Sequence, residues 1–393
     1  MTKKISVFTG NRAEYGLLSP ILQAIEAHEA LALQLVVGGA HLDESFGKTR
    51  DEIVADGFEI AAEVPGDAGA DTARAIGQGV VAVADALDAL CPDAVVVYGD
   101  RFEAFAALIA ASQANRPTAH IEGGDKTEGG ALDDSVRHAM TKLAHLHFAT
   151  NADAAWRITA MGEEPWRVHD VGLPVLDRIR AGDFPDAETV AATLGLDLAR
   201  PVILFTQHAI TTEADQAIAQ LEPSLAAMER AIAEHDAQVV ATYPNNDDGG
   251  RAIIARLNDW ADGRAGVTLR PSLGRALYHG TLNVAGRVTK GLCMGNSSSG
   301  LKETPAFGCP TINVGARQSG RLAAENVMHV PTDADTLFVA ITAAITNEAI
   351  RTSAASCANP YGDGHTGPRV AALLAETDWS EPAILQKKLT LDP

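Results

Sequence analysis

Residues 5–16 read ISVFTGNRAEYG, a short β-branched apolar run that breaks at a glycine and continues into a helix-forming segment. A buried strand, a tight turn and a helix form the first half of a βαβ unit, the building block of parallel sheets. The free backbone N–H groups of such a turn, together with Arg12, can hold a phosphate. The plainer alternative is an exposed arginine at a helix start. We therefore predict an α/β fold with parallel sheets.

The strand–helix rhythm occurs in two series along the chain, whose 393 residues allow two or three domains of roughly 150 residues each. We expect a first Rossmann-like domain over 1–182 and a second over 183–365. A crossover helix and tail are expected over 366–393, with the helix at 368–376 returning to the first domain and a loose tail from residue 380. Strands are predicted at 5–9, 33–37, 94–98, 118–121, 147–150 and 168–171, then at 202–205, 239–243, 267–269, near 292 and at 311–314, with helices at 15–27 and 102–114.

Composition narrows the classes of partner. The net charge of −20 opposes attraction to nucleic acid or to an anionic membrane, so neither is expected. Arginines and helix N-termini still permit a small anion such as a nucleotide. The four cysteines lie far apart without C-x-x-C spacing, which predicts neither a metal site nor a disulfide framework. With no signal-peptide core and no apolar run of about 18 residues, we expect a cytoplasmic protein.

Carboxylates follow the predicted strands of the first series. Asp100 and Glu122 each come just after a strand, and Asp133 and Asp134 stand at a predicted helix start with Arg137. Ligands collect at the carboxyl ends of parallel strands, and crowded carboxylates shift each other's pKa, which suits proton transfer. The alternatives are a structural ion pair of Asp100 with Arg101 or with a neighbouring loop, and helix capping by Asp133 or Asp134.

The strand ends of the second series carry neutral and small polar residues. His208 follows the first of these strands, where it can donate to a phosphate or act as a general acid, and Asn245 follows the second. The segment 295–303, GNSSSGLKE, predicts a small-residue turn opening a helix, where N–H groups and hydroxyls can face a diphosphate while Glu303 accepts ribose hydroxyls. The alternatives are a structural histidine and serine N-caps.

Two motifs are missing and one is discounted. Neither G-x-x-x-x-G-K-[ST] nor G-x-S-x-G is present, which disfavours a P-loop ATPase and an α/β-hydrolase. Residues 362–367 match G-x-G-x-x-G, but no strand precedes them and Lys387 stands where an acidic ribose ligand is required. We therefore expect no NAD and no other cofactor.

Several segments together resemble the hydrolysing UDP-N-acetylglucosamine 2-epimerases of sialic acid biosynthesis, and the likeness runs nearly end to end. One departure is the stretch 125–132, which is about two residues longer than in the animal enzyme and leaves open both the sugar specificity and the choice between Asp133 and Asp134. The segments that carry the resemblance are 10–15 (GNRAEY), 99–101 (GDR), 120–124 (HIEGG), 133–138 (DDSVRH), 295–298 (GNSS), 313–318 (NVGARQ) and 359–364 (NPYGDG).

The resemblance implies a GT-B architecture of two Rossmann-like domains with a cleft between them, a UDP-sugar substrate and a homodimer or homotetramer. The implied reaction eliminates UDP to give a 2-acetamidoglucal, which water then converts to N-acetylmannosamine without a metal or redox cofactor. The family's acid/base residues match Asp100, Glu122 and Asp133, and a histidine near the diphosphate matches His208. Its substrate-binding positions match Arg12, Asn245, Ser297, Ser298, Glu303 and Arg317, and Arg101 and Arg137 lie within matched motifs.

Four alternative functions remain open at this stage. The same chemistry on UDP-N,N′-diacetylbacillosamine, in a legionaminic acid pathway, requires only a different sugar pocket. A non-hydrolysing 2-epimerase would keep UDP attached and return UDP-N-acetylmannosamine. A GT-B glycosyltransferase would need an acceptor, and a nucleotide-sugar sensor would bind without turnover.

Overall fold

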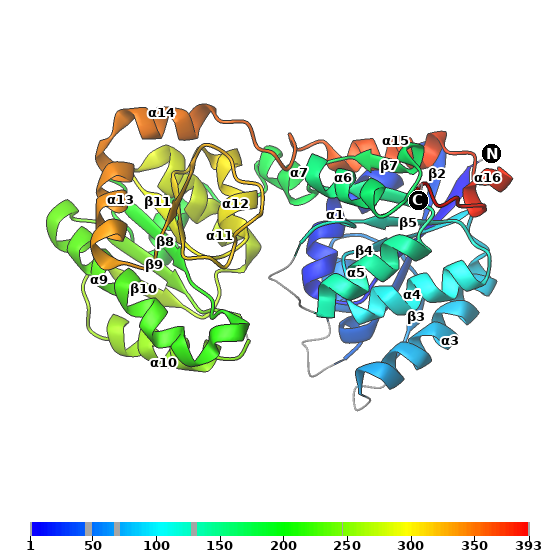
Figure 1. Ribbon diagram of the computed structural model, residues 1–393, viewed down its shortest axis with the longest axis horizontal. Coiled ribbons are helices and arrows are strands. Elements are labelled where there is room, and N and C mark those ends of the chain that lie inside the picture. Colours follow the sequence, from blue (N-terminus) through cyan, green and yellow to red (C-terminus); the bar gives the residue numbers. More distant parts are fainter. Residues whose placement is uncertain (1, 44–48, 67–70, 127–131, 246, 392–393) are drawn as a thin grey trace. The chain divides into compact units, whose positions relative to one another are not determined.

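A computed structural model describes residues 2–43, 49–66, 71–126, 132–245 and 247–391. The chain forms two compact units, and each consists of a sheet covered by helices (Figure 1). Unit 1 comprises Met1–Arg178 and Tyr361–Pro393, and unit 2 comprises Ile179–Pro360. The predicted α/β class with two Rossmann-like domains is confirmed. Among the described helices, none has both the length and the apolar composition that a bilayer-spanning segment needs.

In its described part, unit 1 holds a parallel sheet in the order β3-β2-β1-β4-β5-β6-β7. All five residues of β4 are buried, as expected for a strand covered by helices on both faces. The strands are β1 (Lys3–Thr9), β2 (Leu31–Gly38), β3 (Ile60–Val64), β4 (Ala94–Tyr98), β5 (Thr118–Ile121), β6 (Leu146–Ala149) and β7 (Val168–Asp170). The helices are α1 (Arg12–Glu26), α2 (Arg50–Ala55), α3 (Thr72–Leu90), α4 (Phe102–Gln113), α5 (Leu132–Leu143), α6 (Ala152–Ala160), α7 (Val175–Arg180), α15 (Thr366–Glu376) and α16 (Pro382–Leu385).

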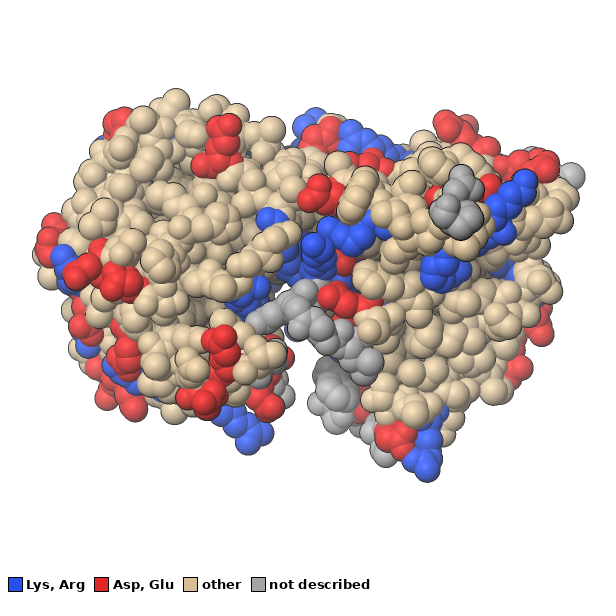
Figure 2. Space-filling view, in the orientation of Figure 1, with Lys and Arg blue, Asp and Glu red and all other residues tan. Residues whose placement is uncertain are grey.

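Unit 2 repeats the plan, with its described strands in the order β10-β9-β8-β11-β12-β13, all parallel. The strands are β8 (Val202–Thr206), β9 (Gln238–Thr242), β10 (Val267–Arg270), β11 (Leu292–Gly295), β12 (Thr311–Val314) and β13 (Val327–Val330). The helices are α8 (Ala187–Leu194), α9 (Ala217–His235), α10 (Gly250–Ala261), α11 (Gly274–Asn283), α12 (Ser299–Lys302), α13 (Ala334–Thr346) and α14 (Glu348–Ser356). Acidic side chains are spread over the surface of both units, in keeping with the net charge (Figure 2).

The predicted strands match observed strands to within two residues at either end, but β3 and β13 were missed. Both are edge strands, and neither has a long run of buried side chains. β3 reads IAAEV and buries only Val64 fully, while β13 reads VMHV and buries only Val330. Since an edge strand needs less apolar surface, its sequence signal is weak.

The chain returns to unit 1 through α15, which packs against α1. The carboxylate of Asp177 accepts hydrogen bonds from the backbone N–H groups of Thr366 (2.8 Å) and Gly367 (2.7 Å), and so caps this helix. The N–H groups that a dinucleotide would require in the G-x-G-x-x-G segment are therefore already engaged, which agrees with discounting that motif.

The prediction of a loose tail from residue 380 is wrong for residues 380–391. The tail forms the short helix α16, and the fully buried guanidinium of Arg167 donates to the carbonyls of Ile384 (2.8 Å) and Ala383 (2.6 Å). Lys387 forms an ion pair with buried Glu163 at 2.7 Å. The partners of this tail lie more than 200 residues away in sequence, so a local reading of the polar tail cannot detect them.

Replacing the buried arginine tests this anchor. We expect Arg167→Ala to lower the free energy of unfolding of unit 1 by about 3 kcal/mol, because several buried carbonyls and Glu164 lose their donor. Urea unfolding followed by circular dichroism measures the change, with the exposed Arg74→Ala as the control. An unfolding midpoint of the Arg167 variant equal to that of wild type would contradict the anchoring role.

Candidate functional site

The candidate residues gather where each sheet reverses its strand order. The reversal lies between β1 and β4 in unit 1, and between β8 and β11 in unit 2. At such switch points the loops after the two strands diverge and leave a crevice at the carboxyl ends. Arg12, Asp100 and Arg101 follow the first pair of strands, and His208, Ser297 and Ser298 follow the second.

Arg137 organises the carboxylates of unit 1. Its guanidinium forms an ion pair with Asp100 at the end of β4 and a second with Asp134 at 2.9 Å. It also donates to the backbone carbonyl of Asp125 at 2.9 Å, so one side chain of α5 joins the loops after β4 and β5. The expected alternative pairing of Asp100 with Arg101 is not observed, since Arg101 pairs with Glu103 at 3.2 Å.

Burial and neighbouring charges perturb this cluster. Desolvation raises the pKa of Asp100 above its ordinary value; Arg137 opposes this change, while the charges of Glu122 and Asp133 add to it. The pKa of Arg137 is raised in spite of its burial, because several carboxylates surround it. A carboxyl group with a raised proton affinity beside a permanent cation is suited to proton transfer.

Glu122 stands at the end of β5 with a positive φ of 65°, which is uncommon for a residue with a side chain. The fully buried His120 lies two residues earlier, and its Nε2 donates to the carbonyl of Gly99 at 2.7 Å. Desolvation lowers the pKa of His120 to about 3, so the imidazole stays neutral and keeps this donor. The ends of β4 and β5, with Asp100 and Glu122, are thereby held together.

The start of α5 separates the two neighbouring aspartates. Asp133 is exposed, whereas Asp134 is the one that pairs with Arg137, although i,i+4 spacing placed Asp133 on the same face as Arg137. The helix start adjoins residues 127–131, which lie outside the described part of the chain. Because this segment includes most of the extended stretch 125–132, its consequences for sugar specificity stay a prediction.

A cavity of about 730 Å³ lies in unit 1 at the carboxyl ends of β1, β2 and β3, and Arg101, the residue after Asp100, is part of its wall. Asn11, Arg101 and Glu103 lie on its polar side, and most of the remaining wall is apolar. Arg12 does not line it and pairs with Glu52 at 3.0 Å in an exposed position. The apolar wall residues include Leu42, Val64, Ala75, Val83, Phe102 and Ala106.

Asn296 is the centre of the site in unit 2, and the sequence-based prediction missed its role. Its side chain accepts from the N–H of His208 (2.7 Å) and donates to the carbonyl of the same residue (2.9 Å). Its own carbonyl accepts from Arg317 (3.2 Å) and Gln318 (2.8 Å). Asn296 thus joins the residue after β8, the turn after β11 and the segment after β12. The only feature of the sequence that indicated this role was the position of Asn296 within the 295–298 motif.

His208 is a neutral hydrogen-bond donor in this arrangement. Its Nδ1 accepts the backbone N–H of Asn245 at 3.0 Å, which places the ring proton on Nε2. Burial, followed by the charge of Arg317, lowers the pKa of His208 to about 4. The ring can therefore offer an N–H to an anion at neutral pH, which is a narrower role than the general acid considered from sequence.

The serine turn and Glu303 complete this part of the site. Ser298 occupies the N-cap of α12 without a side-chain capping hydrogen bond, so the serine-capping alternative is not observed. The hydroxyls of Ser297 and Ser299 lie 3.0 Å apart, and Tyr278 meets Ser299 at 2.7 Å. Glu303 accepts from Nε2 of buried His279 at 2.8 Å. Tyr278 and His279 supply support that no sequence motif indicated.

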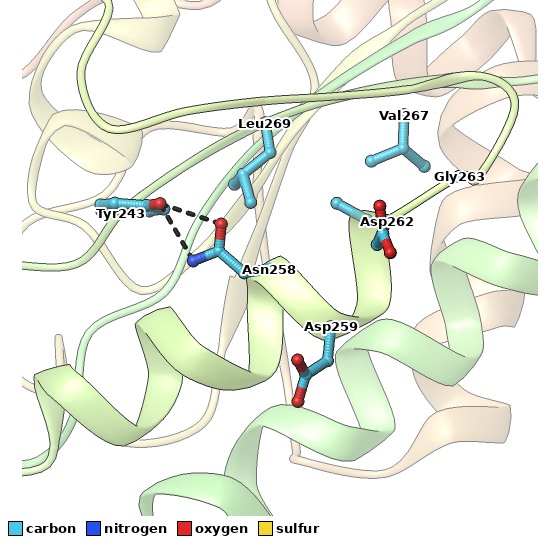
Figure 3. A pocket seen from close by; sticks show the side chains of 8 residues that line it. Tyr243, Asn258, Asp259, Asp262, Gly263, Val267 and Leu269 are labelled. Atoms are coloured by element: carbon cyan, nitrogen blue, oxygen red, sulfur yellow. Dashed lines mark hydrogen bonds between the residues drawn. The ribbon is translucent and has the colours of Figure 1, made fainter.

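A second groove of about 510 Å³ contains none of the predicted site residues (Figure 3). It lies along edge strand β10 and the end of α10, where the Tyr243 hydroxyl meets the Asn258 amide. Within the described residues, no group of three His, Cys, Asp or Glu side chains is arranged to hold a metal ion.

Comparison with known proteins identifies the family of this chain. The sequence model of the family described as UDP-N-acetylglucosamine 2-epimerase matches residues 23–375. The chain belongs to the UDP-N-acetylglucosamine 2-epimerase family. Within the family, it is 32% identical over 378 residues to the UDP-N,N′-diacetylbacillosamine 2-epimerase (hydrolyzing) of Legionella pneumophila, covering 95% of this chain and 96% of that protein. It is also 32% identical over 344 residues to the UDP-N-acetylglucosamine 2-epimerase of Neisseria meningitidis serogroup B, covering 86% of each.

Solved structures of epimerases share the fold. The UDP-N-acetylglucosamine 2-epimerase from Neisseria meningitidis bound to UDP-GlcNAc has a TM-score of 0.78 at 18% identity, covering 96% of this chain and 100% of that one. The Methanocaldococcus jannaschii UDP-GlcNAc 2-epimerase in complex with UDP-GlcNAc and UDP has a TM-score of 0.71 at 18% identity, covering 95% and 100%.

The protonation state of His208 is directly measurable in this epimerase-family chain. We expect its imidazole to remain neutral with the proton on Nε2 down to about pH 4, because burial and Arg317 disfavour the cation. Long-range ¹H–¹⁵N NMR spectra across pH 4–8 report both the tautomer and the titration, and the variant His208→Gln assigns the signal. A transition near pH 6.5, or a proton on Nδ1, would contradict the arrangement.

Proposed function

We propose that this protein is a hydrolysing 2-epimerase that converts UDP-N-acetylglucosamine into N-acetylmannosamine and UDP. The observation that carries the proposal is the carboxylate cluster in which Asp100 pairs with Arg137, while the charges of Glu122 and Asp133 act on Asp100 and its pKa is raised. The hydrolysing relative from Legionella pneumophila, which is matched over nearly its full length, supports the same reaction type. A glycosyltransferase would have no evident use for this cluster.

The reaction requires two proton transfers at one carbon. A carboxylate removes the C2 proton, the C1–O bond breaks, and UDP leaves with the bonding electron pair to give a 2-acetamidoglucal. Water then adds its oxygen to C1 and gives one proton to a carboxylate of the cluster, while a carboxyl group supplies a proton to C2 on the opposite face. Because Asp100, Glu122 and Asp133 interact, they titrate as a coupled set that holds and releases these protons.

The leaving diphosphate gathers negative charge as the C1–O bond breaks. Donors already fixed around it stabilise that charge without further reorganisation. We assign this role to His208 through Nε2–H and to the serine turn of unit 2, and Glu303 is oriented by His279 to accept ribose hydroxyls. The further substrate-binding residues in this proposal are Arg12, Arg101, Arg137, Asn245, Ser297, Ser298 and Arg317.

UDP-N,N′-diacetylbacillosamine is the second candidate substrate, and the cavity of about 730 Å³ favours it. This sugar carries a second acetamido group where N-acetylglucosamine has a hydroxyl group, and a methyl group where N-acetylglucosamine has a hydroxymethyl group. The largely apolar walls next to Arg101 and Glu103 suit such substituents better than hydroxyls. The Legionella relative is named as a hydrolysing 2-epimerase of UDP-N,N′-diacetylbacillosamine, which also supports this substrate.

Incubation with each UDP-sugar in D₂O tests the proposal. Free UDP and a 2-epimeric sugar with one deuterium at C2 are expected, and relative kcat/KM values identify the preferred sugar. An epimerised UDP-sugar without free UDP would establish the non-hydrolysing reaction instead. Release of UDP only in the presence of an acceptor would establish a glycosyltransferase, and tight UDP binding without turnover a sensor.

Amide substitutions test the carboxylates individually. We expect Asp100→Asn, Glu122→Gln and Asp133→Asn each to lower kcat by about 100-fold or more, because an amide neither accepts nor returns the C2 proton. UDP affinity, measured by calorimetry, should remain close to that of wild type, because these residues do not hold the nucleotide. The exposed Asp153→Asn on α6 is the matched control. Ordinary turnover in all three variants would refute the assignment.

A further inference from the structure

Tyr98 lies between the two strand ends that carry the carboxylates. It is the last residue of β4, two positions before Asp100, and it pairs in register with Ile121, the residue before Glu122. Its side chain is only 3% exposed and belongs to the core on the α1 side of the sheet. The phenol is therefore part of the scaffold beside Glu122, although no sequence motif singled it out.

The hydroxyl of Tyr98 is sealed from solvent and has no hydrogen-bond partner among the described residues. Buried hydroxyls are almost always paired, because an unpaired one forfeits its hydration without compensation. Other buried phenols in this chain follow the rule. Tyr15 meets Asp56 at 2.6 Å, and Tyr278 meets Ser299 at 2.7 Å. Tyr98 is an exception, and it is located next to the proposed proton-transfer groups.

The surroundings of Tyr98 are acidic. Burial raises the pKa of this phenol well above its usual range. Glu122 raises it further, both by its charge and by the approach of its carboxylate to the hydroxyl, ahead of the charges of Asp125 and Asp100. The hydroxyl therefore keeps its proton and acts as a donor. The charged and titratable groups that influence Glu122 or its partners are Asp100 after β4, Asp125 in the loop after β5, Arg137 on α5, and the neutral His120 on β5.

We propose that Tyr98 is a positioning residue whose hydroxyl donates a hydrogen bond to the carboxylate of Glu122 during the reaction. The backbone of Glu122 lies in the left-handed region, one residue after Ile121, the register partner of Tyr98. A buried donor fixed in the core restricts the carboxylate to one orientation. The consequence for turnover rests on the proposed function, whereas the contact between Tyr98 and Glu122 does not.

The hydrogen bond has a signature in the pH–rate profile. A donor stabilises an ionised carboxylate more than the neutral acid. Loss of the hydroxyl is therefore expected to move one limb of the profile to higher pH. This is the acidic limb if the carboxylate that Tyr98 holds acts as a base, and the basic limb if it acts as an acid.

Tyr98→Phe tests the contact with the loss of a single oxygen atom. We expect kcat to fall about tenfold while KM changes less than twofold, and the limb that depends on Glu122 to move up by about one pH unit. The thermal midpoint should stay close to that of wild type, because the aromatic ring keeps its packing in the core. Tyr15→Phe, which removes another buried phenol oxygen from unit 1, should leave the pH profile in place. An unshifted profile in a folded Tyr98→Phe protein would overturn the proposal.

A measurement on the wild-type protein is independent of turnover and of variant folding. With ¹³Cζ-labelled tyrosine, the Tyr98 signal should follow the ionisation of Glu122, and this dependence should vanish in Glu122→Gln. A Tyr98 signal that does not respond to Glu122 would also overturn the inference. Should the wild-type protein release no UDP from any UDP-sugar while its Tyr98 signal still follows Glu122, that result would contradict the proposed function and support the contact between Tyr98 and Glu122.

Discussion

The guanidinium of Arg137 is the constraint on which the candidate site of unit 1 depends. It is nearly buried, and the carboxylates of Asp100 and Asp134 bind it from the end of β4 and from its own helix. Without this cation, the buried negative charges would repel each other and the loops after β4 and β5 would lose their common partner. Arg137 therefore both balances the negative charge of the cluster and fixes the positions of the two loops.

The compensation of charge by Arg137 is incomplete. The pKa of Asp100 stays raised because desolvation outweighs its pairing with Arg137. Neutral His120 contributes position without charge, since its protonated form is strongly disfavoured by burial.

The sequence predicted the strands that carry the site because those strands are central. β4 and β8 are buried nearly throughout, so their apolar runs are strong, and the residues after them were correctly placed at the carboxyl ends of the sheets. The features that the sequence did not predict depend on edge position, on contacts between distant residues or on local helix geometry. Edge strands β3 and β13 need little apolar sequence, and the anchoring of the tail by Arg167 depends on contacts across more than 200 residues. The pairing of Asp134 rather than Asp133 with Arg137 depends on the geometry of a helix start, which i,i+4 spacing alone does not determine.

The two units differ in the kind of polarity that they place at their switch points, and the difference has an electrostatic reason. A cluster of carboxylates would repel a diphosphate, so the acid/base groups and the phosphate donors of a nucleotide-sugar enzyme must be kept apart. Unit 1 carries the acidic cluster, whereas unit 2 carries a neutral histidine, hydroxyls and Arg317, organised by the amide of Asn296. An amide is suited to this task because it donates and accepts at once without adding charge. A carboxylate in place of Asn296 could accept from the N–H of His208, but it could not donate to the carbonyl and would bring negative charge next to the ring that is proposed to face phosphate.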